Sequence, residues 1–168
     1  MQSRLFLTMA AATVLSLTTG TQARAETANS QIHYAGDAQP SFTGPAELFT
    51  GEVQVKRAFP ANEIAHYSGA YVRFAPGARS AWHHHPAGQH IVVTEGTALT
   101  GTRDGRAIAF AQGEAIWCPP ELDHWHGATP DAAMTHFVVT ASKAGENVVW
   151  KEKVSEQEYE DAVAAAKR

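Results

Sequence analysis

Short runs of apolar and β-branched residues recur along the chain from residue 47 onward, and each run ends at Gly, Pro, Asn or Asp. The runs occupy residues 53–59, 65–74, 89–94, 98–103, 107–110, 115–118 and 134–141. Their length and spacing are typical of strands in an all-β sandwich or barrel, and no long helical period interrupts them. Asp104-Gly105 between two runs predicts a hairpin turn, because glycine readily adopts a positive φ. The pattern therefore predicts an all-β domain.

The N-terminal residues have the pattern of a signal peptide. Arg4 is followed by a mostly apolar run at 5–17, and the small residues Ala23 and Ala25 offer a cleavage site after Ala25. The apolar run is shorter than a membrane span and is interrupted by hydroxyl residues. We therefore expect residues 1–25 to be removed on export to the periplasm, leaving a mature protein without a membrane anchor.

The segments on either side of the predicted strands are of different kinds. Residues 26–45 are polar and aperiodic, which favours an extended N-terminal arm before a barrel at 46–150. Residues 151–168 include Ser155 and Glu158, which fit a capping box, and are rich in Glu, Ala and Lys. A short C-terminal helix is therefore expected.

Composition narrows the class of function. The chain has 168 residues, 44% hydrophobic and 18% charged, which suits one globular domain. Its formal net charge of −4 and lack of a basic patch argue against a nucleic-acid partner. Cys118 is the only cysteine, so no internal disulfide can form, and its apolar neighbours predict a buried thiol.

Histidines cluster between residues 83 and 136, where seven of the nine lie. Residues two apart in an extended segment face the same side, so His83 and His85 point together while His84 points away. The same spacing brings His124 and His126 together. The histidines that we expect at the surface are His33, His66, His84 and His90.

A metal site follows from two such groups arriving from distant strands. Gln89 begins a predicted strand after a short bend, which allows its amide to approach His83 and His85. With His124, this donor set is neutral and contains only nitrogen and oxygen. Manganese, ferrous iron, nickel and zinc accept such donors, whereas structural zinc sites are rich in cysteine.

The sequence resembles the cupin family at two motifs. The residues that match are Gly77, His83, His85, Gln89 and Gly96 in the first motif, and Gly113, Pro119 and His124 in the second. Gln89 replaces the glutamate of the first motif. In the second, Glu121 replaces a glycine and Ala128 replaces the final asparagine. The likeness implies a jelly-roll β-barrel holding one divalent metal ion through His83, His85, Gln89 and His124.

Residues 82–89, 124–130 and 133–136 look like the small bacterial cupins that include manganese-dependent hydroxynitrile lyases, in which glutamine also replaces glutamate. This resemblance implies manganese, a small-molecule substrate and a homodimer or larger homo-oligomer. It also implies a catalytic base at His136. The implied substrate pocket consists of Ala70, Val72, Phe74 and His126.

Three functions remain open on the sequence. A bound divalent ion acting as a Lewis acid, with a histidine base, would suit a lyase for small hydroxynitrile or carbonyl compounds. A redox metal in the same site would suit a cupin dioxygenase. A non-catalytic cupin that binds a metal or a metabolite is the third alternative.

Overall fold

Residues 31–166 are described by the computed structural model. The expected signal peptide at 1–25 and the start of the expected arm at 26–45 lie outside these residues. The described part of the arm includes a short strand, Ser41–Thr43, that joins the edge of a sheet.

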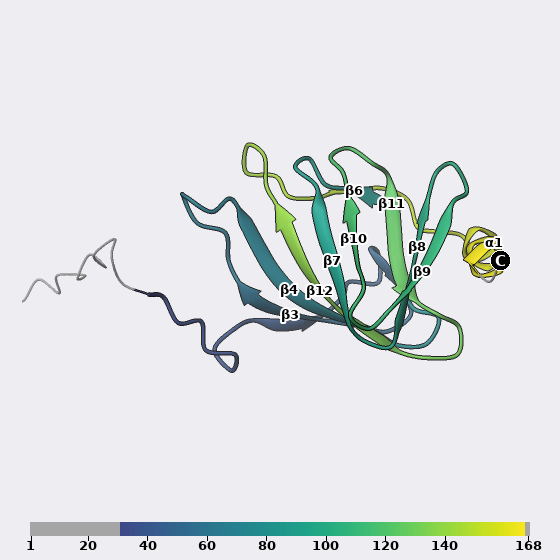
Figure 1. Ribbon diagram of the computed structural model, residues 1–168, viewed down its shortest axis with the longest axis horizontal. Helices are drawn as coiled ribbons and strands as arrows, with labels where there is room; N and C mark the ends of the chain where they lie inside the picture. Colours follow the sequence, from purple (N-terminus) through teal and green to yellow (C-terminus); the bar gives the residue numbers. More distant parts are fainter. Residues whose placement is uncertain (1–30, 167–168) are drawn as a thin grey trace, which may run out of the picture. The chain divides into compact units, whose positions relative to one another are not determined.

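Two curled antiparallel sheets face each other as the halves of a β-barrel (Figure 1). The first sheet has the order β1 (Ser41–Thr43), β3 (Val53–Phe59), β4 (Tyr67–Phe74), β12 (Met134–Ala141), β7 (Gln89–Glu95) and β10 (Ala115–Cys118). The second contains β13 (Val149–Trp150), β6 (His83–His84), β11 (His124–Ala128), β5 (Arg79–Ser80) and β2 (Phe49–Thr50); in addition, β8 (Thr97–Thr102) pairs with β11, and β9 (Ala107–Ala111) pairs with β8. This arrangement confirms the predicted all-β fold.

All seven predicted strands are present, and their ends lie within two residues of the predicted ends. The pattern did not predict β1, β2, β5, β6, β11 and β13. Four of these have only two residues, too few to show an alternating period. Strand β11 is buried along its whole length, so it lacks the polar positions of a half-exposed strand.

Inward-facing side chains of the first sheet form rows across three strands, because the register is continuous there. Thr140 on β12 pairs with Gln89 on β7 and with Ser68 on β4. Two residues away on β12, Val138 pairs with Ile91 and Ala70. The row of Thr140 thus carries polar groups, and the row of Val138 carries apolar ones.

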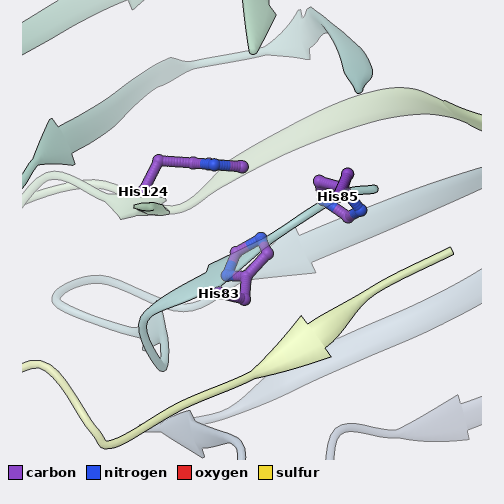
Figure 2. A group of neighbouring side chains, drawn as sticks. All are labelled: His83, His85 and His124. Atoms are coloured by element: carbon purple, nitrogen blue, oxygen red, sulfur yellow. The ribbon is translucent and has the colours of Figure 1, made fainter. Parts of the chain in front are cut away.

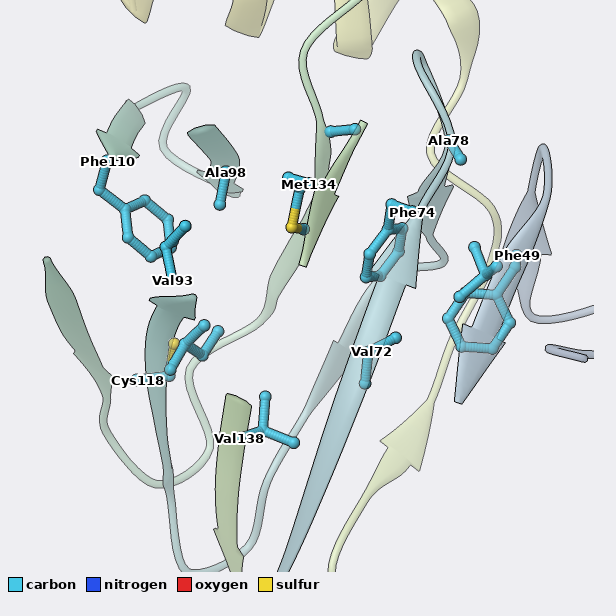
Figure 3. Packing of buried hydrophobic residues seen from close by; sticks show 13 residues of the cluster. Phe49, Val72, Phe74, Ala78, Val93, Ala98, Phe110, Cys118, Met134 and Val138 are labelled. Atoms are coloured by element: carbon cyan, nitrogen blue, oxygen red, sulfur yellow. The ribbon is translucent and has the colours of Figure 1, made fainter. Parts of the chain in front are cut away.

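The barrel interior holds the main hydrophobic core, part of which is shown in Figure 3. Phe74, Val93 and Met134 are almost completely buried in it. Cys118 also belongs to this core, and burial raises the pKa of its thiol to about 12. The buried, unreactive thiol expected from the sequence is confirmed.

A second cluster joins the outer side of the barrel to helix α1 (Glu156–Ala166). Trp125 on β11 packs against Tyr159 of the helix at a ring-centroid distance of 5.8 Å. The helix begins with the predicted capping box, in which the Glu158 amide donates to Ser155 Oγ at 3.2 Å and the Ser155 amide donates to the Glu158 carboxylate at 2.8 Å. None of the helices in the described part of the chain is long and apolar enough to cross a membrane.

A buried arginine also fastens this helix to the barrel. The Arg79 guanidinium donates to the Glu156 carboxylate at 2.9 Å and lies 4.6 Å from the centre of the Tyr159 ring. The side chain of Arg79 is only 5% exposed, so its charge depends on these partners rather than on water.

Candidate metal centre

Three imidazoles meet on the inner side of the second sheet (Figure 2). His83 lies on β6 and His85 directly follows it, while His124 begins β11 and pairs with His83. One ring nitrogen from each histidine lies within 4.8 Å of those from the other two. The predicted alternation is therefore confirmed, because His83 and His85 are buried on one side of the strand.

Backbone carbonyls fix the tautomer of all three rings. His83 Nδ1 lies 2.9 Å from the Ala81 carbonyl oxygen, and His124 Nδ1 lies 2.9 Å from that of Leu122. His85 Nδ1 lies 2.5 Å from the Asn147 carbonyl oxygen. A carbonyl only accepts hydrogen bonds, so each Nδ1 carries the proton and each Nε2 keeps a lone pair, as metal-binding histidines require.

Burial keeps these imidazoles in their neutral form. It lowers the pKa of His83 and of His124 below the usual value, and it lowers the pKa of His85 to about 4. The Nε2 atoms of His85 and His124 are buried without a hydrogen-bond partner among the described residues. Unpartnered buried nitrogen atoms are costly, and a bound cation would satisfy them. The three histidines therefore fit a metal ion.

Gln89 offers an oxygen beside this group. Its Nε2 donates to Thr140 Oγ1 at 2.8 Å across the β7–β12 pair. Its Oε1 is buried and has no hydrogen-bond partner within residues 31–166. The Gln89 side chain also lines the same cavity as His83 and His85. An amide oxygen held in this way has the chemistry of a fourth, neutral ligand.

A cavity of about 550 Å³ opens beside the three histidines. Its lining is mostly apolar and includes Ala70 and Val72, two residues of the predicted pocket, together with Phe49 and Trp150. This volume is within the usual range for small-molecule sites, which are typically about 300–1,000 Å³. The centre could therefore be reached by a small organic compound.

Phe74 and His136, two other predicted site residues, lie behind the cavity wall. His126 lines the cavity, whereas Phe74 and His136 do not. His136 Nε2 lies 3.0 Å from His126 Nδ1, and the Phe74 ring packs against both imidazoles. Burial lowers the pKa of His136 to about 4 and holds that of His126 well below its usual value. Phe74 thus supports the histidine pair instead of forming the pocket wall.

His84 was expected at the surface, but its side chain is largely covered by neighbouring residues. Its side chain is 14% exposed and bridges Glu121 at 3.1 Å and Asp123 at 3.2 Å, on the side of the strand opposite His83. His33, His66 and His90 are exposed as expected.

Sequence reasoning missed the residues that orient the ligands. The alternation of residues 134–141 places Thr140 on the same face as Val138 and His136, so this pattern could have identified it. No sequence signal identifies the Asn147 carbonyl as the partner of His85, because the two are 62 residues apart and Asn147 lies in a loop.

Comparison with known proteins agrees with this geometry. Residues 70–140 match the cupin domain family. Over 121 residues, covering 72% of this chain and 92% of the relative, the sequence is 41% identical to an (R)-mandelonitrile lyase from Granulicella tundricola. The fold and the sequence together show that the chain belongs to the cupin family.

Solved structures support the same assignment. A cupin-like protein from Thermotoga maritima has a TM-score of 0.68 and 32% identity, covering 79% of this chain and 97% of the other. A polyketide cyclase from Streptomyces resistomycificus has a TM-score of 0.56 and 18% identity, covering 81% and 99%. The second likeness concerns the fold alone.

Proposed function

We propose that this protein is a metal-dependent lyase that cleaves an aromatic hydroxynitrile into a carbonyl compound and hydrogen cyanide. The observation that carries the proposal is the group of three buried imidazoles beside an apolar cavity. The Nε2 atoms of His85 and His124 have no hydrogen-bond partner in residues 31–166. The 41% identity to an (R)-mandelonitrile lyase supports this choice of reaction. We propose manganese as the metal, held by His83, His85, His124 and Gln89, because these donors are neutral nitrogen and oxygen atoms.

The bound ion would supply Lewis-acid stabilisation of negative charge on a substrate oxygen. Two histidines of the chain would then accept the proton of the substrate hydroxyl group. His126 reaches the cavity, and its Nδ1 is held by His136 Nε2 at 3.0 Å. In the tautomer that carries a proton on His126 Nδ1, His126 Nε2 has a lone pair for the substrate hydroxyl proton. In this scheme, His136, the base implied by resemblance, positions His126 and shares the charge.

The bond changes balance without a further reactant. The hydroxyl O–H bond breaks, its proton goes to His126, and its electron pair forms the carbonyl. The carbon–carbon bond to the nitrile breaks, and its electron pair leaves with cyanide, which takes up the proton from His126 to give hydrogen cyanide and the neutral imidazole. Ala70 and Val72 line the cavity with small apolar side chains that leave room for an aromatic ring.

Cleavage of racemic mandelonitrile by manganese-loaded protein, with and without oxygen, tests this proposal. We expect benzaldehyde and hydrogen cyanide at equal rates in both atmospheres, and loss of activity and metal in His124→Ala. The control His66→Ala removes an exposed histidine and should keep both. An absolute need for oxygen would indicate a dioxygenase instead. Full metal content without any turnover of hydroxynitriles would contradict the lyase.

We also propose that the protein is exported to the periplasm and assembles as a homodimer or larger homo-oligomer. Fractionation of cells that express the full chain, with mass spectrometry of the mature N-terminus, tests the cleavage after Ala25. Light scattering of the purified protein tests the assembly. An uncleaved cytoplasmic protein contradicts the first statement, and a monomeric mass contradicts the second.

A further inference from the structure

Strand β3 places one arginine, Arg57, at the edge of the cavity, where its side chain is exposed. Side chains alternate along β3, so Arg57 shares the inward face of Val53 and Val55. It pairs with Ala70 on β4, whose small side chain leaves space in front of it. Arg57 and Ala70 both line the cavity.

This guanidinium has no protein partner in the part of the chain that the structure describes. No acidic side chain in residues 31–166 forms an ion pair with it, and the two cation–π contacts found there belong to Arg79 and Arg103. Arg57 is also the only lysine, arginine, aspartate or glutamate among the described residues that line the cavity. A positive charge at the edge of an apolar cavity, without a counter-ion in residues 31–166, is suited to an anionic ligand.

The order of the strands places Arg57 three strands away from Gln89. Their strands are separated by β12 and β4, and the two residues lie in neighbouring rows: Gln89 pairs with Thr140, whereas Arg57 pairs with Ala70, the partner of Val138. Three steps between neighbouring strands correspond to roughly 14 Å along the sheet. Gln89 is buried whereas Arg57 is exposed, so the two side chains line the inner and the outer part of the same cavity.

We propose that Arg57 is a specificity-determining residue that binds a carboxylate on the substrate, at the end remote from the reacting carbon. The substrate class would then be aromatic hydroxynitriles, or the corresponding carbonyl compounds, that carry a carboxylate on the ring. The choice of hydroxynitriles as substrates rests on the proposed lyase function. The carboxylate site itself rests only on the position of Arg57. A guanidinium can donate two parallel hydrogen bonds to a carboxylate, and such charge-assisted hydrogen bonds are stronger than those between neutral groups.

Paired substrates test the specificity of the metal-loaded protein. The cyanohydrin of 4-carboxybenzaldehyde is compared with that of its methyl ester, and the measured quantity is the ratio of their kcat/KM values. We expect the protein to favour the carboxylate by about tenfold or more, as charge-assisted hydrogen bonds allow. Arg57→Gln should bring this ratio close to one, and Arg57→Lys should restore part of it.

Lys56→Gln is the matched control, since it removes a positive charge from the next, outward-facing position of β3. This variant should keep the wild-type ratio. If it lowers the ratio as much as Arg57→Gln does, general electrostatic attraction explains the preference and the assigned role of Arg57 is wrong. A ratio that is the same in wild type and Arg57→Gln also overturns the proposal.

Binding separates this inference from the lyase reaction. Calorimetry of benzoate and methyl benzoate on the metal-loaded protein should give tighter binding of benzoate, and Arg57→Gln should weaken benzoate about tenfold. If no hydroxynitrile is cleaved but this pattern is found, the lyase is wrong and the carboxylate site stands. If benzoate binds equally to wild type and Arg57→Gln, the metal or another group holds it, and the role of Arg57 is refuted.

Discussion

Thr140→Val removes the hydroxyl that holds the Gln89 amide while keeping a side chain of nearly the same shape. The hydroxyl oxygen accepts from Gln89 Nε2 at 2.8 Å, and both side chains are buried. A buried donor left without an acceptor costs about 1–3 kcal/mol. The amide then gains free energy by turning its nitrogen away from the apolar valine, which also turns its oxygen away from the metal position.

The expected consequence is weaker metal binding, by about tenfold to a hundredfold, as is typical when a partner of a metal ligand is lost. Competition with a chromogenic chelator measures the manganese dissociation constant, and thermal unfolding of the metal-free protein measures the stability cost separately. Thr135→Val is the control, because it removes an exposed threonine hydroxyl bonded to Glu95 at 3.1 Å on the outer side of the same strand. A folded Thr140→Val protein with an unchanged manganese dissociation constant would refute the reasoning, and with it the role of Gln89 as a ligand.

Other predictions concern stability. Lowering the pH of metal-free protein should destabilise it from pH 6.5 down to about 4, because His136 has a pKa of about 4 when folded and about 6.5 when unfolded, so the unfolded chain binds the proton first. The loss should reach about 3 kcal/mol for this group; urea unfolding at several pH values measures it, and a curve that is flat over this range would contradict it. Glu156→Gln should lower the melting temperature by removing the charged partner of buried Arg79. An unchanged temperature would show that the Tyr159 ring and the carbonyl oxygens of Gly77 and Val154, to which Arg79 also donates, suffice. Gly101→Ala should be clearly destabilising, because the new Cβ would lie 2.5 Å from Trp125 Nε1; wild-type stability in chemical unfolding would disprove this close contact.

The sequence by itself determined the β-class of the fold and three members of the candidate metal site. Alternation is a local property of the backbone, so the spacing of His83 and His85 already decides that they share a face. The cupin motifs added His124, which local pattern alone could not connect to them. The capping box and the Asp104-Gly105 turn could also be predicted, because each depends only on residues a few positions apart.

The tertiary structure decided which histidine reaches the cavity and which groups orient it. His126 and His136 are both inward-facing by pattern, but only their packing against Phe74 places His136 behind His126. The acceptor for His85 is a loop carbonyl 62 residues away, and no local rule brings a loop to a chosen side chain.

Arg57 illustrates the same division. The alternation along β3 places it on the same face of the strand as Val53 and Val55, although it is charged and exposed. Only the order of the strands shows that this face opens into the cavity opposite Gln89. Strand period is set by the covalent chain and can be read from it, whereas strand order depends on which distant segments pair, and that is fixed by the free energy of the whole barrel.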